Sequence, residues 1–106
     1  MTLFLALVFM LLTSKQKRHL RGLAHSLKPV VMVGNSGITE NLITELNERI
    51  AQHELLKVRI SGQDRSDRLK MAEELCEKSN SQLVTTIGHI AVLYRRGEYP
   101  KIKLPR

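Results

Sequence analysis

The chain has 106 residues, which is enough for one domain that buries a core without disulfides or metal ions. Its 17 Lys and Arg residues against 10 Asp and Glu residues give a net charge of +7, which favours a polyanionic partner such as nucleic acid. The single cysteine, Cys76, excludes an internal disulfide, as is typical of a cytoplasmic protein, and its place on an apolar helical stripe indicates a small core residue.

The first twelve residues are almost uniformly apolar and do not match the pattern that follows. A membrane-spanning helix needs about 20 such residues, so this run is too short. A secretory signal carries positive charge before its apolar run, whereas Lys15, Lys17 and Arg18 come after this one. Met10 is a second candidate for the first residue of the protein. We therefore interpret residues 1–12 as an extension outside the fold and residues 13–106 as the domain. We do not expect association with a membrane, and a short membrane anchor is the minority alternative.

The first predicted helix is amphipathic and basic. Thr13 and Gln16 have the spacing of a capping box. Apolar residues then recur at helical intervals: Leu20, Leu23, Ala24 and Leu27. Arg18 and Arg21 project from the opposite side, which predicts a cationic face, although a merely solvated face is the alternative. The helix should end before Pro29, because the residue preceding a proline is pushed out of the α region.

A strand, a glycine turn and a second helix follow. Residues 30–33, Val-Val-Met-Val, predict a strand buried on both faces, since β-branched residues dominate and no polar residue alternates with them. The sequence Gly34-Asn35-Ser36-Gly37 predicts a sharp turn, and Thr39 is a candidate N-cap of the helix that continues to about residue 52. Unpaired N–H groups at such a junction suit a phosphate, but an ordinary connecting turn has the same spacing.

The remaining chain predicts a third strand-and-helix unit and a hairpin. Leu56, Val58 and Ile60 alternate with polar residues, two of them basic, which indicates a strand with one buried and one basic face. A third helix over about residues 65–78 carries Glu residues on its outer face, away from any polyanion. Residues 82–87 and 90–94 are rich in β-formers and are separated by Gly88-His89, which predicts a hairpin.

The predicted order is therefore α-β-α-β-α-β-β, an α/β fold. Right-handed crossovers should place successive helices on a common face of a mostly parallel sheet, to which the last hairpin adds an antiparallel strand. The turn at Gly34 leaves the carboxyl end of its strand, where open α/β sheets usually hold ligands.

Nothing in the sequence has the pattern of an enzyme or of a metal site. The four histidines show no metal-ligand spacing with each other or with Cys76, and no Ser-His-acid set or carboxylate pair stands out. The glycine turn is neither a P-loop nor a dinucleotide fingerprint, and Ile38 occupies the position where a nucleophile elbow requires glycine. We expect no catalysis, no metal ion, no cofactor and no small-molecule substrate.

Aromatic residues are scarce, which bears on the kind of nucleic acid expected. Tyr94 and Tyr99 are the only tyrosines, and both phenylalanines lie in the apolar extension. Base stacking on a sheet platform is therefore not expected, and contacts should fall on phosphate, sugar and helix shape, which favours structured RNA. The alternative is a protein-interaction module whose basic surface docks an acidic partner.

Several ordered motifs resemble those of the CRM domain, a family named for chloroplast RNA splicing and ribosome maturation. They are residues 28–39, Lys-Pro-Val-Val-Met-Val-Gly-Asn-Ser-Gly-Ile-Thr, residues 54–58, Glu-Leu-Leu-Lys-Val, residues 87–88, Ile-Gly, and residues 93–97, Leu-Tyr-Arg-Arg-Gly. The similarity runs from about residue 14 to residue 106. It is strongest to the single-domain bacterial form, the YhbY-type protein associated with precursors of the large ribosomal subunit.

The resemblance implies a two-layer fold with a four-stranded mixed sheet, similar to the C-terminal domain of translation initiation factor three. It also implies RNA binding through the Gly-x-x-Gly loop. The RNA-binding residues expected on this basis, with the residues that flank the motifs, are Gly34, Asn35, Ser36, Gly37, Thr39, Lys17, Arg18, Arg21, Lys28, Arg95 and Arg96. The loop has no Lys or Arg between its glycines, so phosphate affinity would come from backbone N–H groups and flanking cations, and Glu40 opposes an anion there.

Together, the residues and the resemblance predict a monomeric, cytoplasmic, non-catalytic assembly factor. Its expected partner is structured RNA, namely ribosomal RNA of the large-subunit precursor.

Overall fold

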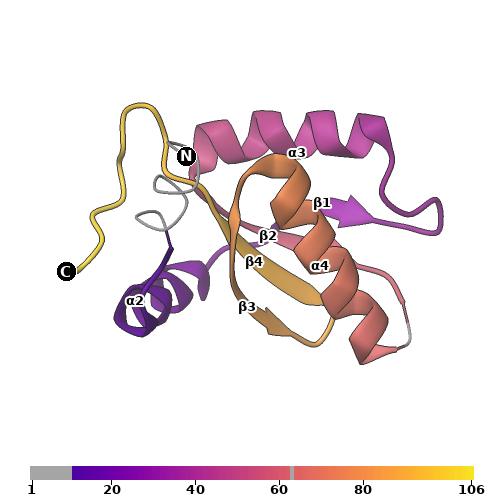
Figure 1. The fold of residues 1–106 in the computed structure, drawn as a ribbon, viewed down its shortest axis with the longest axis horizontal. Coiled ribbons are helices and arrows are strands. Elements are labelled where there is room, and N and C mark those ends of the chain that lie inside the picture. Colours follow the sequence, from indigo (N-terminus) through magenta and orange to yellow (C-terminus); the bar gives the residue numbers. More distant parts are fainter. Residues whose placement is uncertain (1–10, 63) are drawn as a thin grey trace, which may run out of the picture.

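The computed structural model describes residues 11–62 and 64–106, and the predicted extension over residues 1–10 lies outside them. The described elements follow the predicted order (Figure 1). They are α2 (Ser14–Ala24), β1 (Pro29–Val33), α3 (Glu40–His53), β2 (Leu55–Ile60), α4 (Arg65–Ser79), β3 (Gln82–Ile87) and β4 (Ile90–Tyr94). No helix in these two ranges is long and apolar enough to cross a bilayer.

The four strands form one mixed sheet in the order β1-β2-β4-β3 (Figure 1). β1 and β2 are parallel and are joined through α3, whereas β4 is antiparallel to both of its neighbours, β2 and β3. The predicted hairpin over β3 and β4 is confirmed, with its turn at Gly88 and His89. The predicted α/β fold with a four-stranded mixed sheet is therefore confirmed, and β1 and β3 form its two edges.

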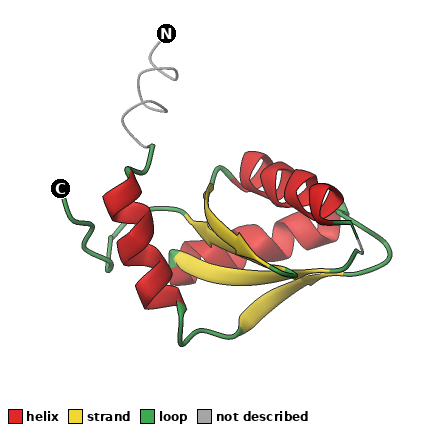
Figure 2. Cartoon of the chain, turned by 90° about the horizontal axis from the view of Figure 1, so that it is seen from below, coloured by secondary structure: helices red, strands yellow, loops and turns green. Residues whose placement is uncertain are grey.

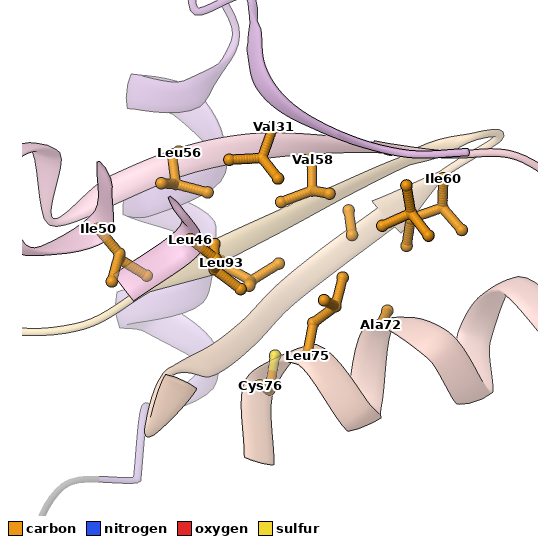
Figure 3. Packing of buried hydrophobic residues seen from close by; sticks show 12 residues of the cluster. Val31, Leu46, Ile50, Leu56, Val58, Ile60, Ala72, Leu75, Cys76 and Leu93 are labelled. Atoms are coloured by element: carbon orange, nitrogen blue, oxygen red, sulfur yellow. The ribbon is translucent and has the colours of Figure 1, made fainter. Parts of the chain in front are cut away.

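One face of the sheet packs against α3 and α4 (Figure 3). The residues of this first core cluster are Val31, Val33, Leu46, Ile50, Leu56, Val58, Ile60, Ala72, Leu75, Cys76, Ala91 and Leu93. Leu56, Val58 and Ile60 all point into it, as the alternation in β2 predicted. Cys76 is the core residue that its position on the helical stripe indicated, and burial raises the pKa of its thiol to about 11, so the thiol is protonated at neutral pH.

The opposite face of the sheet is covered by α2. Leu20 and Ala24 pack against Leu55, Val92 and Tyr94, whose side chains alternate with those of the first cluster along β2 and β4. The expectation of a common face for all helices is thus confirmed for α3 and α4 but wrong for α2. The crossover rule applies to helices that join parallel strands, whereas α2 precedes the first strand and is not bound by it.

β1 is not buried on both faces, contrary to the prediction. Val31 and Val33 are each 1% exposed, but Val30 is 37% and Met32 is 65% exposed. β1 is an edge strand, and α2 packs mainly on the middle and the far side of the sheet, so the second face of β1 is left open. We call this surface, formed by the exposed residues Val30, Met32, Arg59 and Ile87 and by the partly buried Ile90, the open sheet face.

The beginning of α2 agrees with the prediction, whereas its end comes earlier than predicted. The capping box is confirmed, because Thr13 and Gln16 each accept a hydrogen bond from the backbone N–H of the other. The helix ends at Ala24, four residues before Lys28, where the chain turns toward β1. At its beginning, the backbone N–H of Leu12 donates to the side-chain oxygen of Gln82 at 2.7 Å. Leu12, which the interpretation placed in the extension, therefore contacts the domain.

Candidate nucleic-acid interface

The Gly-x-x-Gly loop is a tight turn that projects from the carboxyl end of β1. The N–H of Gly37 donates to the carbonyl of Gly34 at 3.0 Å, and Gly37 has a φ of +72°, which only glycine adopts without strain. Gly34 has no such φ, and a side chain there would meet no atom within 4 Å. The fold itself therefore requires glycine at Gly37 but not at Gly34, where a bare backbone would instead permit the close approach of a ligand.

Thr39 has the role predicted for it at the start of α3. Its hydroxyl oxygen accepts a hydrogen bond from the N–H of Leu42 at 3.1 Å, and its own φ of −101° is extended. The N–H groups of Glu40 and Asn41, at the start of the first helical turn, have no partner inside the helix. Glu40 also lies in that first turn, so the best place for an anion is the turn itself, ahead of the helix.

The basic side of α2 faces solvent, as the helical pattern predicted. Lys17, Arg18 and Arg21 are exposed, while Leu20 and Ala24 on the other side are buried. Leu23 is 43% exposed, so the apolar stripe is narrower than its spacing suggested. The helix contains four Lys and Arg residues and no acidic residue. Lys28 is exposed as well, in the segment that leads from α2 into β1.

The two arginines after β4 have different surroundings. Arg96 is exposed, but Arg95 is partly buried and its guanidinium is bound inside the protein. It donates to the side-chain oxygen of Asn47 at 3.0 Å and to the carbonyl of Ser79 at 2.8 Å, and a weaker bond at 3.3 Å reaches the carbonyl of Asn47. Arg95 thus joins α3, the end of α4 and the end of β4, and of the two arginines only Arg96 presents its charge to solvent.

The predicted site residues do not form one cluster. β1 runs parallel to β2, and β4 runs antiparallel to it, so the loop after β1 and Arg96 after β4 lie at opposite ends of the sheet. Ile90 lies opposite Arg59 and Tyr94 lies opposite Leu55. These two positions of β2 are four residues apart, which alone separates the two ends of the sheet by about 13 Å. Arg96 instead shares a pocket of about 240 Å³ with Gln16 in the first turn of α2. Figures 1 and 2 both show α2 far from the loop between β1 and α3.

A family model describes this chain over most of its length. The CRS1/YhbY (CRM) domain matches residues 12–95, from the residue before the capping box to the first residue after β4. The chain belongs to the CRM domain family. The resemblance stated from its motifs is therefore confirmed, and the first matched residue is Leu12, which contacts Gln82 in the structure.

Relatives of this CRM domain match it nearly end to end. A protein of Haemophilus influenzae named as an RNA-binding protein is 45% identical over 95 residues, which cover 90% of this chain and 96% of the relative. A relative from Bacillus subtilis, named a probable RNA-binding protein, is 43% identical over 96 residues and is covered completely, with 90% of this chain. The solution structure of a Staphylococcus aureus protein proposed to bind RNA is similar at a TM-score of 0.80 and 41% identity, over 90% of this chain and 100% of that one.

The two basic residues of β2 were not among the predicted site residues. Arg59 is exposed on the open sheet face, directly opposite Met32 of β1. The ammonium group of Lys57, on the same face, donates to the carbonyl of Leu27 at 2.9 Å and so holds the segment after α2. The alternation in β2 marked both as a basic face, but only the position of α2 shows that Lys57 is partly covered and Arg59 is open.

Within the described residues there is no group of three or more His, Cys, Asp and Glu side chains that could hold a metal ion. The ring Nδ1 of His89 lies 3.0 Å from the carbonyl of Ile60, an interaction that supports the hairpin turn. Cys76, protonated in the core, is not available as a nucleophile.

Proposed function

We propose that this protein binds structured RNA through one side of the molecule, formed by α2, the open sheet face and the Gly-x-x-Gly loop. The observation that carries the proposal is the separation of charge between the helical layers. α2 has four cations and no acid, and none of the four strands contains an acidic residue. α3 has three acids and one arginine, and α4 has four acids and four cations.

The length of this surface favours a folded RNA over a small ligand. The molecule measures 38 × 32 × 25 Å, and α2 and the loop lie toward opposite ends of its long axis. A nucleotide or short single strand reaches only one of them. A folded RNA presents phosphates along its whole length, so cations at one end and backbone N–H groups at the other can act on it together.

The names of the relatives support RNA binding, and the family resemblance extends the proposal to a cellular role. We infer that the RNA is ribosomal RNA of the large-subunit precursor, and that the protein acts there as a monomeric, cytoplasmic and non-catalytic assembly factor. Counterion release dominates binding of this kind, so the complex should dissociate as salt rises.

Filter binding with a fragment of large-subunit ribosomal RNA tests the proposal. Replacing Lys17, Arg18 and Arg21 together by alanine should weaken binding strongly and lower the magnitude of the salt slope of log affinity by roughly 0.7 to 0.9 for each phosphate that is no longer neutralised. The matched control replaces Arg49, Lys70 and Lys78 of α3 and α4 by alanine. It removes the same charge from the other helical layer, so binding should fall only slightly, through the long-range field.

Equal reductions of affinity in the two triple variants would show that total charge, and not this surface, determines binding. Tight binding of an acidic polypeptide, with no measurable affinity for the RNA, would support the alternative of a protein-interaction module.

A further inference from the structure

Four side chains form a straight row across the open sheet face. Met32 of β1 lies opposite Arg59 of β2, Arg59 lies opposite Ile90 of β4, and Ile90 lies opposite Ile87 of β3. Residues opposite each other in neighbouring strands project from the same face, so the row crosses all four strands, over about 14 Å. We call these four residues the exposed row, in which Met32, Arg59 and Ile87 are exposed and Ile90 is partly buried.

The exposed row has a composition that folding does not explain. Met32 is 65% and Ile87 is 66% exposed, so both are apolar side chains that the core does not use. The exposed Arg59 lies between Met32 and the partly buried Ile90, which separates it from Ile87, on a face whose strands contain no acidic residue. Apolar groups that flank a cation without a nearby carboxylate suit a ligand that is itself flat, apolar on its faces and attached to negative charge.

We propose that the exposed row holds the base of one unpaired nucleotide, so that the RNA recognised is a helix with a bulged or looped-out residue. This inference rests on the proposed RNA binding and makes it more specific. A guanidinium plane stacks on a nucleobase, and Met32 and Ile90, which lie on either side of Arg59, supply apolar contacts to it, while Ile87 extends this apolar surface beyond Ile90. Gly34 follows Met32 by two residues, so the phosphates next to that nucleotide would lie within reach of the N–H groups of the loop.

An apolar protein partner fits the row less well. It would enclose Arg59 without supplying a carboxylate, and an unpaired charge buried in an interface is costly. A nucleotide supplies both a stacking face and a phosphate. The scarcity of aromatic residues is then no obstacle, because Arg59 takes the place of an aromatic side chain.

Two synthetic RNA hairpins with the same stem test the inference, one fully paired and one with a single bulged nucleotide that is a fluorescent adenine analogue. The wild-type protein should prefer the bulged hairpin roughly five- to tenfold, as one stacked base contributes, and the fluorescence of the analogue should change on binding. Arg59→Lys keeps the charge but loses the plane, so it should retain affinity for the paired hairpin and lose the preference. Met32→Ser should also lose the preference, with unchanged thermal stability because its side chain is exposed.

Leu69→Ser is the matched control, since Leu69 is an apolar side chain of α4 that is 42% exposed, and the preference should survive in that variant. Equal affinity of the wild type for both hairpins, or a preference that persists in Arg59→Lys and Met32→Ser, would overturn the inference and leave RNA binding intact. A wild-type dimer that Met32→Ser dissociates would assign the row to a second copy of the chain and overturn it as well. Failure of the wild type to bind either hairpin would instead contradict the proposed function.

Discussion

The carboxylate of Glu54, between α3 and β2, accepts a hydrogen bond from the backbone N–H of Lys101 at 2.7 Å. The N–H groups of Gly97 and Ile102 donate to the same carboxylate at 2.8 and 3.1 Å. Burial of Glu54 opposes its ionisation, but these three donors and the charge of Lys101 outweigh that effect and lower the pKa of the carboxyl. The segment that carries the exposed Arg96 is thus anchored by a buried anion.

Replacing Glu54 by Gln should lower the free energy of unfolding at neutral pH by about 1–3 kcal/mol. The amide has one acceptor oxygen for three partly buried N–H groups, so at least one donor loses its partner or must move. Urea unfolding followed by circular dichroism measures the change in stability. Equal stability of the two proteins would show that the anchor contributes nothing to folding.

The same carboxyl gives stability a pH dependence of defined sign. Its pKa is lower in the folded chain than the ordinary value of 4.5, so its full contribution is present above that value and is lost as the pH falls through the folded-state pKa. The stability difference between the wild type and Glu54→Gln should be constant near neutral pH and shrink below about pH 4.5. A difference that grows on acidification would contradict this assignment.

Replacing Arg95 should affect stability, whereas replacing Arg96 should affect RNA binding. Arg95→Ala leaves the carbonyl of Ser79 and the side chain of Asn47 without their donor, and should cost about 1–3 kcal/mol of stability. Arg96 is exposed and shares a pocket with Gln16 at the start of α2, so it lies beside the proposed RNA surface. Arg96→Ala should leave stability within about 0.5 kcal/mol of the wild type and lower the magnitude of the salt slope for RNA by roughly 0.7 to 0.9. The reverse pattern in the two variants would refute the roles given to these residues.

A carboxylate in the glycine turn should disrupt RNA binding. The new carboxylate of Gly37→Asp repels a phosphate, and its side chain blocks approach to the backbone. A residue other than glycine at a φ of +72° also lowers stability by roughly 1 kcal/mol. Gly37→Ala carries the same backbone strain without the charge, so the difference in RNA affinity between the two isolates the electrostatic effect. Unchanged affinity in a folded Gly37→Asp protein would remove the loop from the interface.

The features predicted best from sequence are those that depend on near neighbours. The capping box at Thr13, the N-cap at Thr39 and the hairpin turn at Gly88 each involve groups within a few residues of one another, so spacing alone identifies them. The apolar alternation in β2 also predicted which face is buried. These local patterns, with the family motifs, were sufficient for the order of elements and the α/β fold.

Features that depend on distant parts of the chain were missed. The environment of Arg95 comes from Asn47, 48 residues earlier, and a run of basic residues gives no sign of it. Met32 has the pattern of a core residue until the sheet order places β1 at an edge. The distance between the loop and Arg96 follows from the antiparallel direction of β4, which motif spacing does not reveal.

The proposed cellular role makes a prediction for cell extracts. On a sucrose gradient at low salt the protein should sediment with precursors of the large ribosomal subunit and be depleted from translating polysomes. Washing with several hundred millimolar salt, roughly the range in which binding to phosphates is screened, should move it to the top of the gradient. Sedimentation with polysomes in proportion to mature subunits would count against an assembly role.

Ultraviolet crosslinking in cells, with the bound RNA sequenced and the crosslinked peptides identified, tests the central proposal most directly. We predict that the RNA is ribosomal RNA of the large-subunit precursor. The crosslinked peptides should come from α2, from the loop between β1 and α3, and from β2 around Arg59. Crosslinks confined to α3 and α4, or RNA drawn from transcripts in proportion to their abundance, would contradict the proposal that this side of the domain recognises that RNA.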